Sequence, residues 1–139
     1  MKQGYTAYKS ANIDTADQGK LILITYDVAI KHAKLALEIF DDRTQLEQRT
    51  KHLFKMQDAI TELLSALRLD VGDVAKNLYR LYDYMLRTII DANIKNNRSK
   101  VIEVLGYLES LREAWAEAII KVKQQSSPQI QLDSVGISG

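Results

Sequence analysis

NLYRLYDYMLRTIIDAN, residues 77–93, is the stretch that decides the fold. Its apolar residues recur at spacings of three or four, which is the period of one face of an α-helix. A second apolar group lies beside the first on the same helix and contains Tyr79, Tyr82, Leu86 and Ile90. One stripe suffices for a bundle core, so the second requires cover from another element or from a partner. The predicted core stripe consists of Leu78, Leu81, Met85, Ile89 and Ala92.

Length and composition indicate a single all-α domain. A chain of 139 residues can bury roughly two-thirds of the surface that its unfolded form exposes. With one proline, Pro128, and six glycines, long stretches of good helix formers run uninterrupted, which disfavours sandwiches, barrels and parallel sheets. The lack of cysteine excludes disulfides and thiolate metal sites.

The charge and hydropathy of the chain disfavour some classes of binding partner. Nineteen Lys and Arg against eighteen Asp and Glu leave a formal charge of +1, and the two signs are interspersed. Nucleic acid and anionic membranes are therefore poor candidates as partners. The first residues lack the apolar run of a signal peptide, and no stretch reaches the roughly eighteen apolar residues of a membrane span. We expect a soluble, cytoplasmic protein.

The helical period predicts four helices, which short links should join into an antiparallel, up-down four-helix bundle over residues 17–124. The expected helices run from about Asp17 to Phe40, from Thr44 to between Leu69 and Val71, from Asp73 to about Asn96, and from Asn97 or Ser99 to about Gln124.

Capping side chains mark the expected helix starts. Each is a short polar residue ahead of an apolar repeat, in two cases with Glu or Gln three residues later. The candidates are Thr15 with Gln18 or instead Asp17, Thr44 with Glu47, Asp73, and Asn97 or Ser99.

Apolar stripes are also expected on the other three helices. The first helix carries two, Ile22, Ala29, Ala33, Ala36 and Phe40 in one and Leu21, Val28, Leu35 and Ile39 in the other. The second carries a heptad-like repeat of Leu46, Leu53, Met56, Ile60, Leu63 and Leu67. The fourth carries Val101, Leu105, Leu108, Leu111 or Arg112, Trp115, Ile119 and Val122.

The two ends of the chain differ from the bundle in composition. Residues 1–16 show no regular period but contain Tyr5 and Tyr8, so this segment either docks on the bundle or is a loose end with incidental tyrosines. Residues 125–139 are rich in Ser, Gln and Gly, and we expect a disordered tail there.

No pattern of residues indicates catalysis, a metal or a cofactor. The Glu-x-x-His motif of di-iron bundles is absent, and the two histidines, His32 and His52, lie on different predicted helices, which favours surface or boundary positions over metal ligation. Asp27 and Asp83 each lie beside a tyrosine and could be imagined as an acid and base. Capping or bonding of tyrosine hydroxyls is the favoured interpretation, so we expect no enzyme.

The surplus apolar surface leaves two interpretations open. Grooves between helices can hold an amphipathic peptide, and tyrosine suits such grooves because it offers apolar area with a polar tip. Alternatively, the tyrosines complete an ordinary core or close a homodimer that acts as a structural or regulatory adaptor. Composition alone does not separate a binding surface from a core or dimer contact.

Three parts of the chain, between about residues 5 and 123, resemble in order and spacing the FliS family of flagellar secretion chaperones. The first comprises Tyr8, Thr15-Ala16-Asp17, Leu21-Ile22 and Tyr26-Asp27-Val28-Ala29-Ile30. The second comprises Asn77-Leu78, Leu81-Tyr82, Tyr84-Met85 and Ala92-Asn93. The third comprises Glu103-Val104, Leu108, Leu111-Arg112 and Ala114-Trp115.

The chain departs from the family pattern near its front. Asp17-Gln18 stands where the family often has Ser-Pro, which keeps a capping residue but loses the proline at the first helical position. Thr25 replaces a leucine, and Val28 replaces a glycine, which adds helix stability and bulk.

The resemblance implies a helical bundle in the bacterial cytosol that binds the disordered C-terminal segment of flagellin. It would prevent premature filament assembly and deliver the subunit to the type III export gate, as a monomer or weak homo-oligomer without a cofactor. It also implies that residues 1–16 act as a lid over part of the client surface. The candidate partner-binding residues are Tyr5, Tyr8, Tyr26, Asp27, Asn77, Tyr79, Tyr82, Tyr84 and Asn93.

Overall fold

Every regular element in the computed structural model, which describes residues 15–68 and 72–138, is a helix. Side chains are described for residues 18–68 and 72–125. The elements are α2 (Thr15–Glu38), the short 3₁₀ helix η1 (Arg43–Gln45), α3 (Leu46–Ser65), α4 (Asp73–Lys95) and α5 (Arg98–Ser138). The predicted all-α class is confirmed. Tyr5 and Tyr8 of the expected lid lie outside the described residues.

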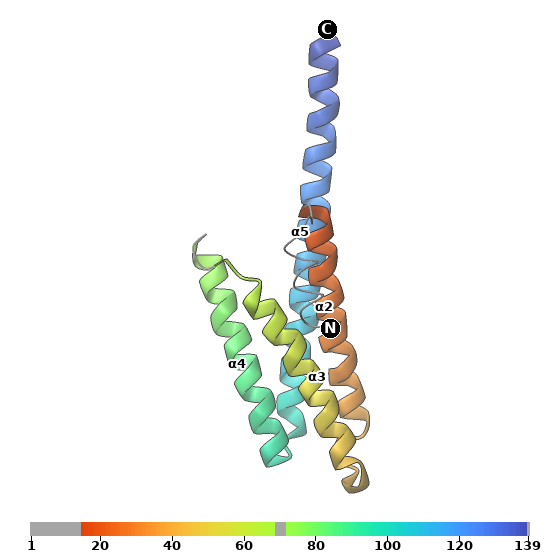
Figure 1. Cartoon of the computed structure of the whole chain (residues 1–139), viewed down its shortest axis with the longest axis vertical. Coiled ribbons are helices and arrows are strands. Elements are labelled where there is room, and N and C mark those ends of the chain that lie inside the picture. The colour runs from red at the N-terminus through yellow and green to blue at the C-terminus, as the bar shows by residue number, and fades with distance from the viewer. Residues whose placement is uncertain (1–14, 69–71, 139) are drawn as a thin grey trace. The chain divides into compact units, whose positions relative to one another are not determined.

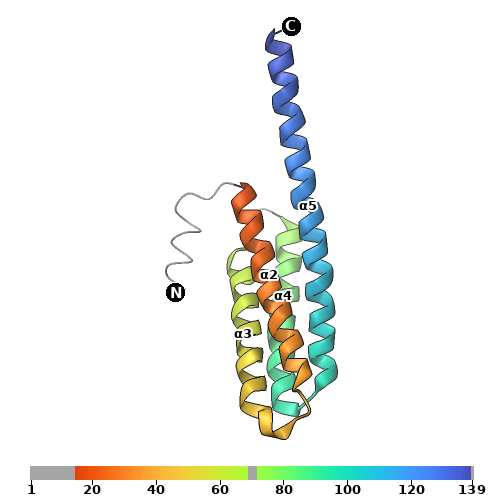
Figure 2. The ribbon, with the colours of Figure 1, turned by 90° about the vertical axis from the view of Figure 1, so that its right-hand side faces the viewer.

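The chain divides into two compact units. One comprises Ile24–Arg112 and so contains most of α2, all of α3 and α4, and the start of α5. Within it, consecutive helices run in opposite directions, as the predicted up-down bundle requires (Figure 2). The other unit comprises Met1–Leu23 and Glu113–Gly139. In its described part the first turns of α2 and the later turns of α5 pack together, since a Cβ added to Gly19 would lie 2.9 Å from Ile119 Cγ1.

The connection from α2 to α3 corrects one predicted cap. The Asp42 carboxylate accepts from the Thr44 backbone N–H at 3.0 Å and from the Thr44 hydroxyl at 2.6 Å, and it caps η1. Thr44 therefore does not form a capping box with Glu47, because its hydroxyl is engaged by a charged acceptor two residues earlier. After the η1 turn, α3 begins at Leu46 without a side-chain cap.

The connection from α3 to α4 corrects a second cap. Helix α3 ends at Ser65, earlier than the apolar repeat suggested, and α4 has Gly72 rather than Asp73 at its N-cap. Gly72 has a φ of 128°, which residues with a Cβ rarely adopt. Asp73 is instead the first residue of the helix, where its charge complements the positive end of the helix dipole.

The connection from α4 to α5 uses two asparagines. Asn96 ends α4 in the left-handed region, with a φ of 53°, and the Asn97 N–H donates to the Ala92 carbonyl at 2.9 Å. Helix α5 begins immediately afterwards at Arg98. The Ser99 hydroxyl, one of the two expected caps, donates to the Asn97 side chain at 2.6 Å.

Helix α5 continues to Ser138, whereas composition alone places its end near Gln124 and a disordered tail beyond (Figure 1). The helix passes Pro128, although an interior proline removes one backbone hydrogen bond. A physical reason is that extending an existing helix adds one hydrogen bond per residue fixed and needs no new nucleus.

The core of the Ile24–Arg112 unit contains many of the predicted stripe residues, whereas Leu46 of α3 is 50% exposed and Val28 of α2 is 39% exposed. In α4, Met85, Ile89 and Ala92 are fully buried, whereas Leu78 and Leu81 at the other end of the stripe are half-buried. Residues from the other helices complete the core, and the small side chains among them allow close helix packing. They include Ala29, Ala33 and Ala36 of α2, Phe40 just after α2, Leu53, Met56, Ile60 and Leu63 of α3, and Val101, Val104 and Leu108 of α5.

Candidate binding surface

Two of the predicted partner-binding tyrosines belong to the core. Tyr26 is completely buried and Tyr82 is 1% exposed, and their hydroxyl groups hydrogen-bond to each other across α2 and α4. Each hydroxyl thereby satisfies the other in a place without water. The prediction that these two side chains form partner surface is corrected, because both project from the buried faces of their helices.

Asp27 lies on the surface and joins α2 to α5. Its two carboxylate oxygens accept from Arg112 Nε at 2.7 Å and Arg112 Nη2 at 3.2 Å, in a bidentate pair. This contact raises the pKa of Arg112. Asp83, the other carboxylate considered for proton transfer, pairs with Arg87 on its own helix at 3.0 Å. Both carboxylates therefore make exposed ion pairs, which suits a structural role.

The two predicted asparagines have different surroundings. Asn77 is exposed, and its side-chain oxygen accepts from Arg80 at 3.4 Å. Asn93 is half-buried, and its backbone and side-chain oxygens both accept from Arg49 at 3.2 Å. In the structure, Asn93 therefore joins the last turn of α4 to α3 through Arg49. Asn77 remains available on the surface.

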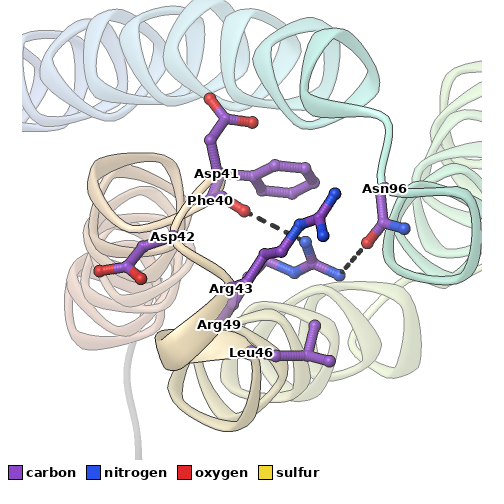
Figure 3. A pocket seen from close by; sticks show the side chains of 7 residues that line it. All are labelled: Phe40, Asp41, Asp42, Arg43, Leu46, Arg49 and Asn96. Carbon is purple, nitrogen blue, oxygen red and sulfur yellow. Dashed lines mark hydrogen bonds between the residues drawn. The ribbon is translucent and has the colours of Figure 1, made fainter.

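Arg49 is a structural feature of the fold that the sequence analysis did not predict. It is only 4% exposed and donates to the Phe40 carbonyl at 3.2 Å and the Asn96 side chain at 2.8 Å (Figure 3). Its Cζ also lies 4.4 Å from the centre of the Phe40 ring. Because these oxygens belong to the C-terminal ends of α2 and α4, their helix dipoles favour the buried cation. The sequence contained one indication of this buried position. Arg49 lies between Leu46 and Leu53 in the apolar repeat of α3, where the helical period predicts a core residue.

An open pocket of about 480 Å³ lies beside Arg49 at this end of the bundle. Two aspartates and two arginines line the pocket, so its formal charges balance. The Arg49 guanidinium on its wall is already held by the Phe40 and Asn93 carbonyls. We therefore assign the pocket to the junction between helices. The residues that line it are Phe40, Asp41, Asp42, Arg43, Leu46, Arg49 and Asn96 (Figure 3).

Tyr84 lies on the side of α4 that faces α5. Its hydroxyl donates to Glu103 Oε2 at 2.7 Å, and Tyr107 donates to the same oxygen at 3.1 Å. The two rings meet edge to face with centroids 6.4 Å apart. Glu103 raises the pKa of Tyr107 because the carboxylate both accepts its hydrogen bond and opposes a second negative charge. Tyr84 is thus exposed but oriented by α5.

Tyr79 lies on the opposite side of α4, near α3. The hydrogen bond from the Thr50 hydroxyl to the Asn93 side chain, 3.4 Å long, sets the register of the two antiparallel helices. Extrapolated by one heptad along each helix, this register predicts that Gln57 lies at the height of Leu86, and by a further heptad that Leu64 lies at the height of Tyr79.

Large apolar side chains are exposed along this side of the α3–α4 pair. Phe54 is 55% exposed, Ile90 is 45% exposed and Ile94 is 74% exposed. Phe54 and Ile90 lie at nearly the same height in the register set by Thr50 and Asn93. We define the α3–α4 apolar surface as Phe54, Tyr79, Leu86, Ile90 and Ile94. Tyr79 and Ile90 belong to the second stripe recognised in the sequence, which the structure leaves largely uncovered on this side.

Residues 15–68 and 72–138 contain no group of three or more His, Asp or Glu side chains placed to hold a metal ion. Over the same residues, none of the helices combines the length and apolarity needed to cross a membrane.

The fold and this surface define a class of protein: an all-α bundle that presents an apolar strip between two helices. Comparison with known proteins identifies the family. The family model described as flagellar protein FliS matches residues 1–122, and the chain belongs to the FliS family of flagellar secretion chaperones.

Curated relatives span most of this chain. It is 35% identical over 115 residues to the flagellar secretion chaperone FliS of Bacillus subtilis, covering 83% of this chain and 85% of the relative. It is 30% identical over 131 residues to the flagellar secretion chaperone FliS of Salmonella typhimurium, covering 89% of this chain and 96% of the relative. The resemblance read from the sequence motifs is confirmed.

Proposed function

We propose that this chain binds the disordered C-terminal segment of flagellin in the cytoplasm. Binding keeps the subunit from polymerising prematurely and assists its secretion by the flagellar type III system, with the loaded complex recognised at the export gate. A role of this kind requires no catalytic step and no cofactor. The observation that carries the proposal is the α3–α4 apolar surface on a helical bundle of the FliS family.

The energetics of binding are consistent with this surface. Each large apolar side chain that goes from exposed to buried contributes roughly 1.5–3 kcal/mol when fully covered. Ordering a disordered client costs several kcal/mol. Because Phe54, Ile90 and Ile94 are each about half exposed or more, covering them together offsets a substantial part of that cost. An amphipathic helix laid along α3 and α4 would use this strip through residues spaced by three and four.

Polar groups at the edges give such a client its orientation. Tyr79 offers a hydroxyl beside the strip, whereas Asn77, two residues earlier, projects from nearly the opposite side of α4. Asp27 and Tyr84 lie on other sides of the bundle. They contact the flagellin segment only if that segment extends beyond the α3–α4 pair onto other helices. Tyr26, Tyr82 and Asn93 act through the fold, since they organise the core and a helix end.

A matched pair of variants tests the site. Ile90→Ala removes a half-exposed side chain from the α3–α4 apolar surface, whereas Ile102→Ala removes one with 48% exposure from α5. We expect Ile90→Ala to weaken binding of a labelled flagellin C-terminal segment about three- to tenfold in an anisotropy titration. Ile102→Ala should change it less than about twofold. Equal effects of the two substitutions would exclude this strip as the specific site.

The role of residues 1–16 forms a separate part of the proposal. We propose that Tyr5 and Tyr8 cover part of the client surface in the empty chaperone and are displaced by flagellin. The support is the spacing of these tyrosines and the family resemblance. Removal of residues 1–16 should then tighten binding of the flagellin segment and lower the solubility of the empty protein. Unchanged affinity together with unchanged solubility would eliminate the lid.

The alternative occupant of the strip is a second copy of the chain. In that case the protein is a helical homodimer without a flagellin client, and its stability rises with protein concentration. Sedimentation equilibrium distinguishes the two, because the flagellin proposal requires that no second copy of the chain covers the strip in the unloaded protein.

A further inference from the structure

The chain's only two histidines meet across the seam between α2 and α3. His32 Nδ1 and His52 Nδ1 are 3.0 Å apart, which is a hydrogen-bonding distance. The ring centroids are 5.2 Å apart and the ring planes are tilted by 32°. The centroid separation exceeds the nitrogen separation by about the width of one imidazole ring, so each Nδ1 points at the other ring.

The hydrogen bond between the two histidines can form only in certain protonation states. An N–H···N hydrogen bond needs one protonated and one unprotonated Nδ1. Two neutral imidazoles meet the requirement, and so does a pair that carries one extra proton, since the imidazolium then donates. When both rings are cationic, each Nδ1 carries a hydrogen, and two N–H groups with the same charge face each other at 3.0 Å.

The surroundings of the pair disfavour the second proton. The charged groups that act on His32 are His52 and Lys55 on α3 and Lys31 on α2, and all three are cations when protonated. The pKa of His32 is lowered from its ordinary value of 6.5, first by burial and then by these charges. Burial and like charge therefore act in the same direction on one side of the seam.

The seam around the pair contains apolar side chains that its opening would expose. Leu35 follows His32 by three residues on the same side of α2, Ile39 lies just after the end of that helix, and both are half-buried. The two imidazoles thus connect α2 to α3 beside a strip of the bundle that is only partly covered.

We propose that His32 and His52 form a one-proton clasp between α2 and α3, which holds the seam closed with zero or one extra proton and loosens it with two. The clasp is independent of flagellin binding and adds a pH-sensitive device to the fold. The direction follows from proton linkage. The unfolded chain binds the second proton more readily than the folded chain, so the stability that the pair provides is complete above the unfolded value of 6.5 and is lost as the pH falls below it.

The direct test uses the full chain with ¹⁵N-labelled histidines. At about pH 7.5 we expect a scalar coupling between the two Nδ1 nuclei across the hydrogen bond, and on acidification two separate protonation steps, with the second below 6.5. The coupling should disappear with the second step. Two independent titrations near 6.5 without any coupling would overturn the clasp.

A second readout measures the seam itself. After correction for the intrinsic rate, amide exchange in the α2–α3 half of the bundle should accelerate about tenfold between about pH 7.5 and about pH 5. The control is His52→Asn, which places a non-titrating amide nitrogen near the position of Nδ1 and should reduce the acceleration to less than about twofold. If His52→Asn, folded at neutral pH, opens in acid as the unmodified chain does, the histidine pair is not the cause.

Discussion

Tyr82 and Tyr79 stand three residues apart on α4 and have opposite environments. Tyr82 is 1% exposed and shares a hydrogen bond with Tyr26 in the core, whereas Tyr79 is 40% exposed at the edge of the α3–α4 apolar surface. The residue type is the same, so the difference comes from the turn of the helix. One apolar stripe of α4 is covered by the bundle, and its neighbour is only partly covered. The covered stripe determines stability, and the uncovered one is available for a partner.

The largest expected contrast lies between two adjacent isoleucines of α4. Ile89 is fully buried and Ile90 is 45% exposed. Ile89→Ala should lower the free energy of unfolding by about 2–5 kcal/mol, because it removes apolar contacts and leaves a cavity. Ile90→Ala should lower the free energy of unfolding by at most about 1 kcal/mol. Its main effect should be on binding of the flagellin segment. Urea denaturation of both variants checks this, and similar losses of stability would remove the distinction between covered and uncovered stripes.

The next effect concerns the buried cation that joins two helix ends. Arg49→Met should lower the free energy of unfolding by about 1.5–3 kcal/mol, since the substitution leaves the Phe40 carbonyl and the Asn93 and Asn96 oxygens without their charged donor. Arg80→Met, on an exposed arginine of α4, is the control. Chemical denaturation measures both, and a neutral Arg49→Met would show that these bonds contribute no net stability.

A smaller effect is expected at the buried tyrosine pair. Tyr82→Phe removes the hydrogen bond between the Tyr82 and Tyr26 hydroxyls and should cost about 1–2 kcal/mol, while the double variant with Tyr26→Phe should cost less than the two single substitutions together. Tyr79→Phe on the surface should be nearly neutral. A double-mutant cycle by thermal denaturation gives the coupling, and strict additivity would mean that the two hydroxyls do not stabilise each other.

The smallest effect compares two helical glycines. A Cβ at Gly106 would meet nothing within 4 Å, so Gly106→Ala should raise the free energy of unfolding by about 0.5–1 kcal/mol through helix propensity. A Cβ at Gly19 would lie 2.9 Å from Ile119, so the same gain in Gly19→Ala is offset by displacement of that side chain. Differential scanning calorimetry should show a higher melting temperature for Gly106→Ala than for Gly19→Ala. The reverse order would contradict the close packing at Gly19.

Much of the fold could be predicted from helical period. Spacing alone identified the four helices, the buried face of α4 and the small-residue stripe of α2, because burial of an amphipathic face is the main force that positions each helix. Local caps were harder. Asp42 displaced the expected Thr44 cap and Gly72 displaced Asp73, since backbone geometry at these turns depends on the neighbouring helix.

The binding surface could be predicted only in part. The second stripe of α4 was recognised, but period alone did not separate Tyr82 from Tyr79, because a rotation of a few tens of degrees about the helix axis decides burial. Phe54 was missed because it is a single apolar residue outside the heptad repeat of α3. Arg49 and the two histidines were missed as contacts because their partners are distant in the sequence and depend on helix register.

Calorimetric titration of this chain with the C-terminal segment of its flagellin tests the central claim most directly. One-to-one binding, a negative heat-capacity change and a gain of helix by circular dichroism are predicted, because a disordered client must fold as it covers the α3–α4 apolar surface. A monomeric, folded chain that releases no heat with the segment and gains no helix at any temperature tested would contradict the claim.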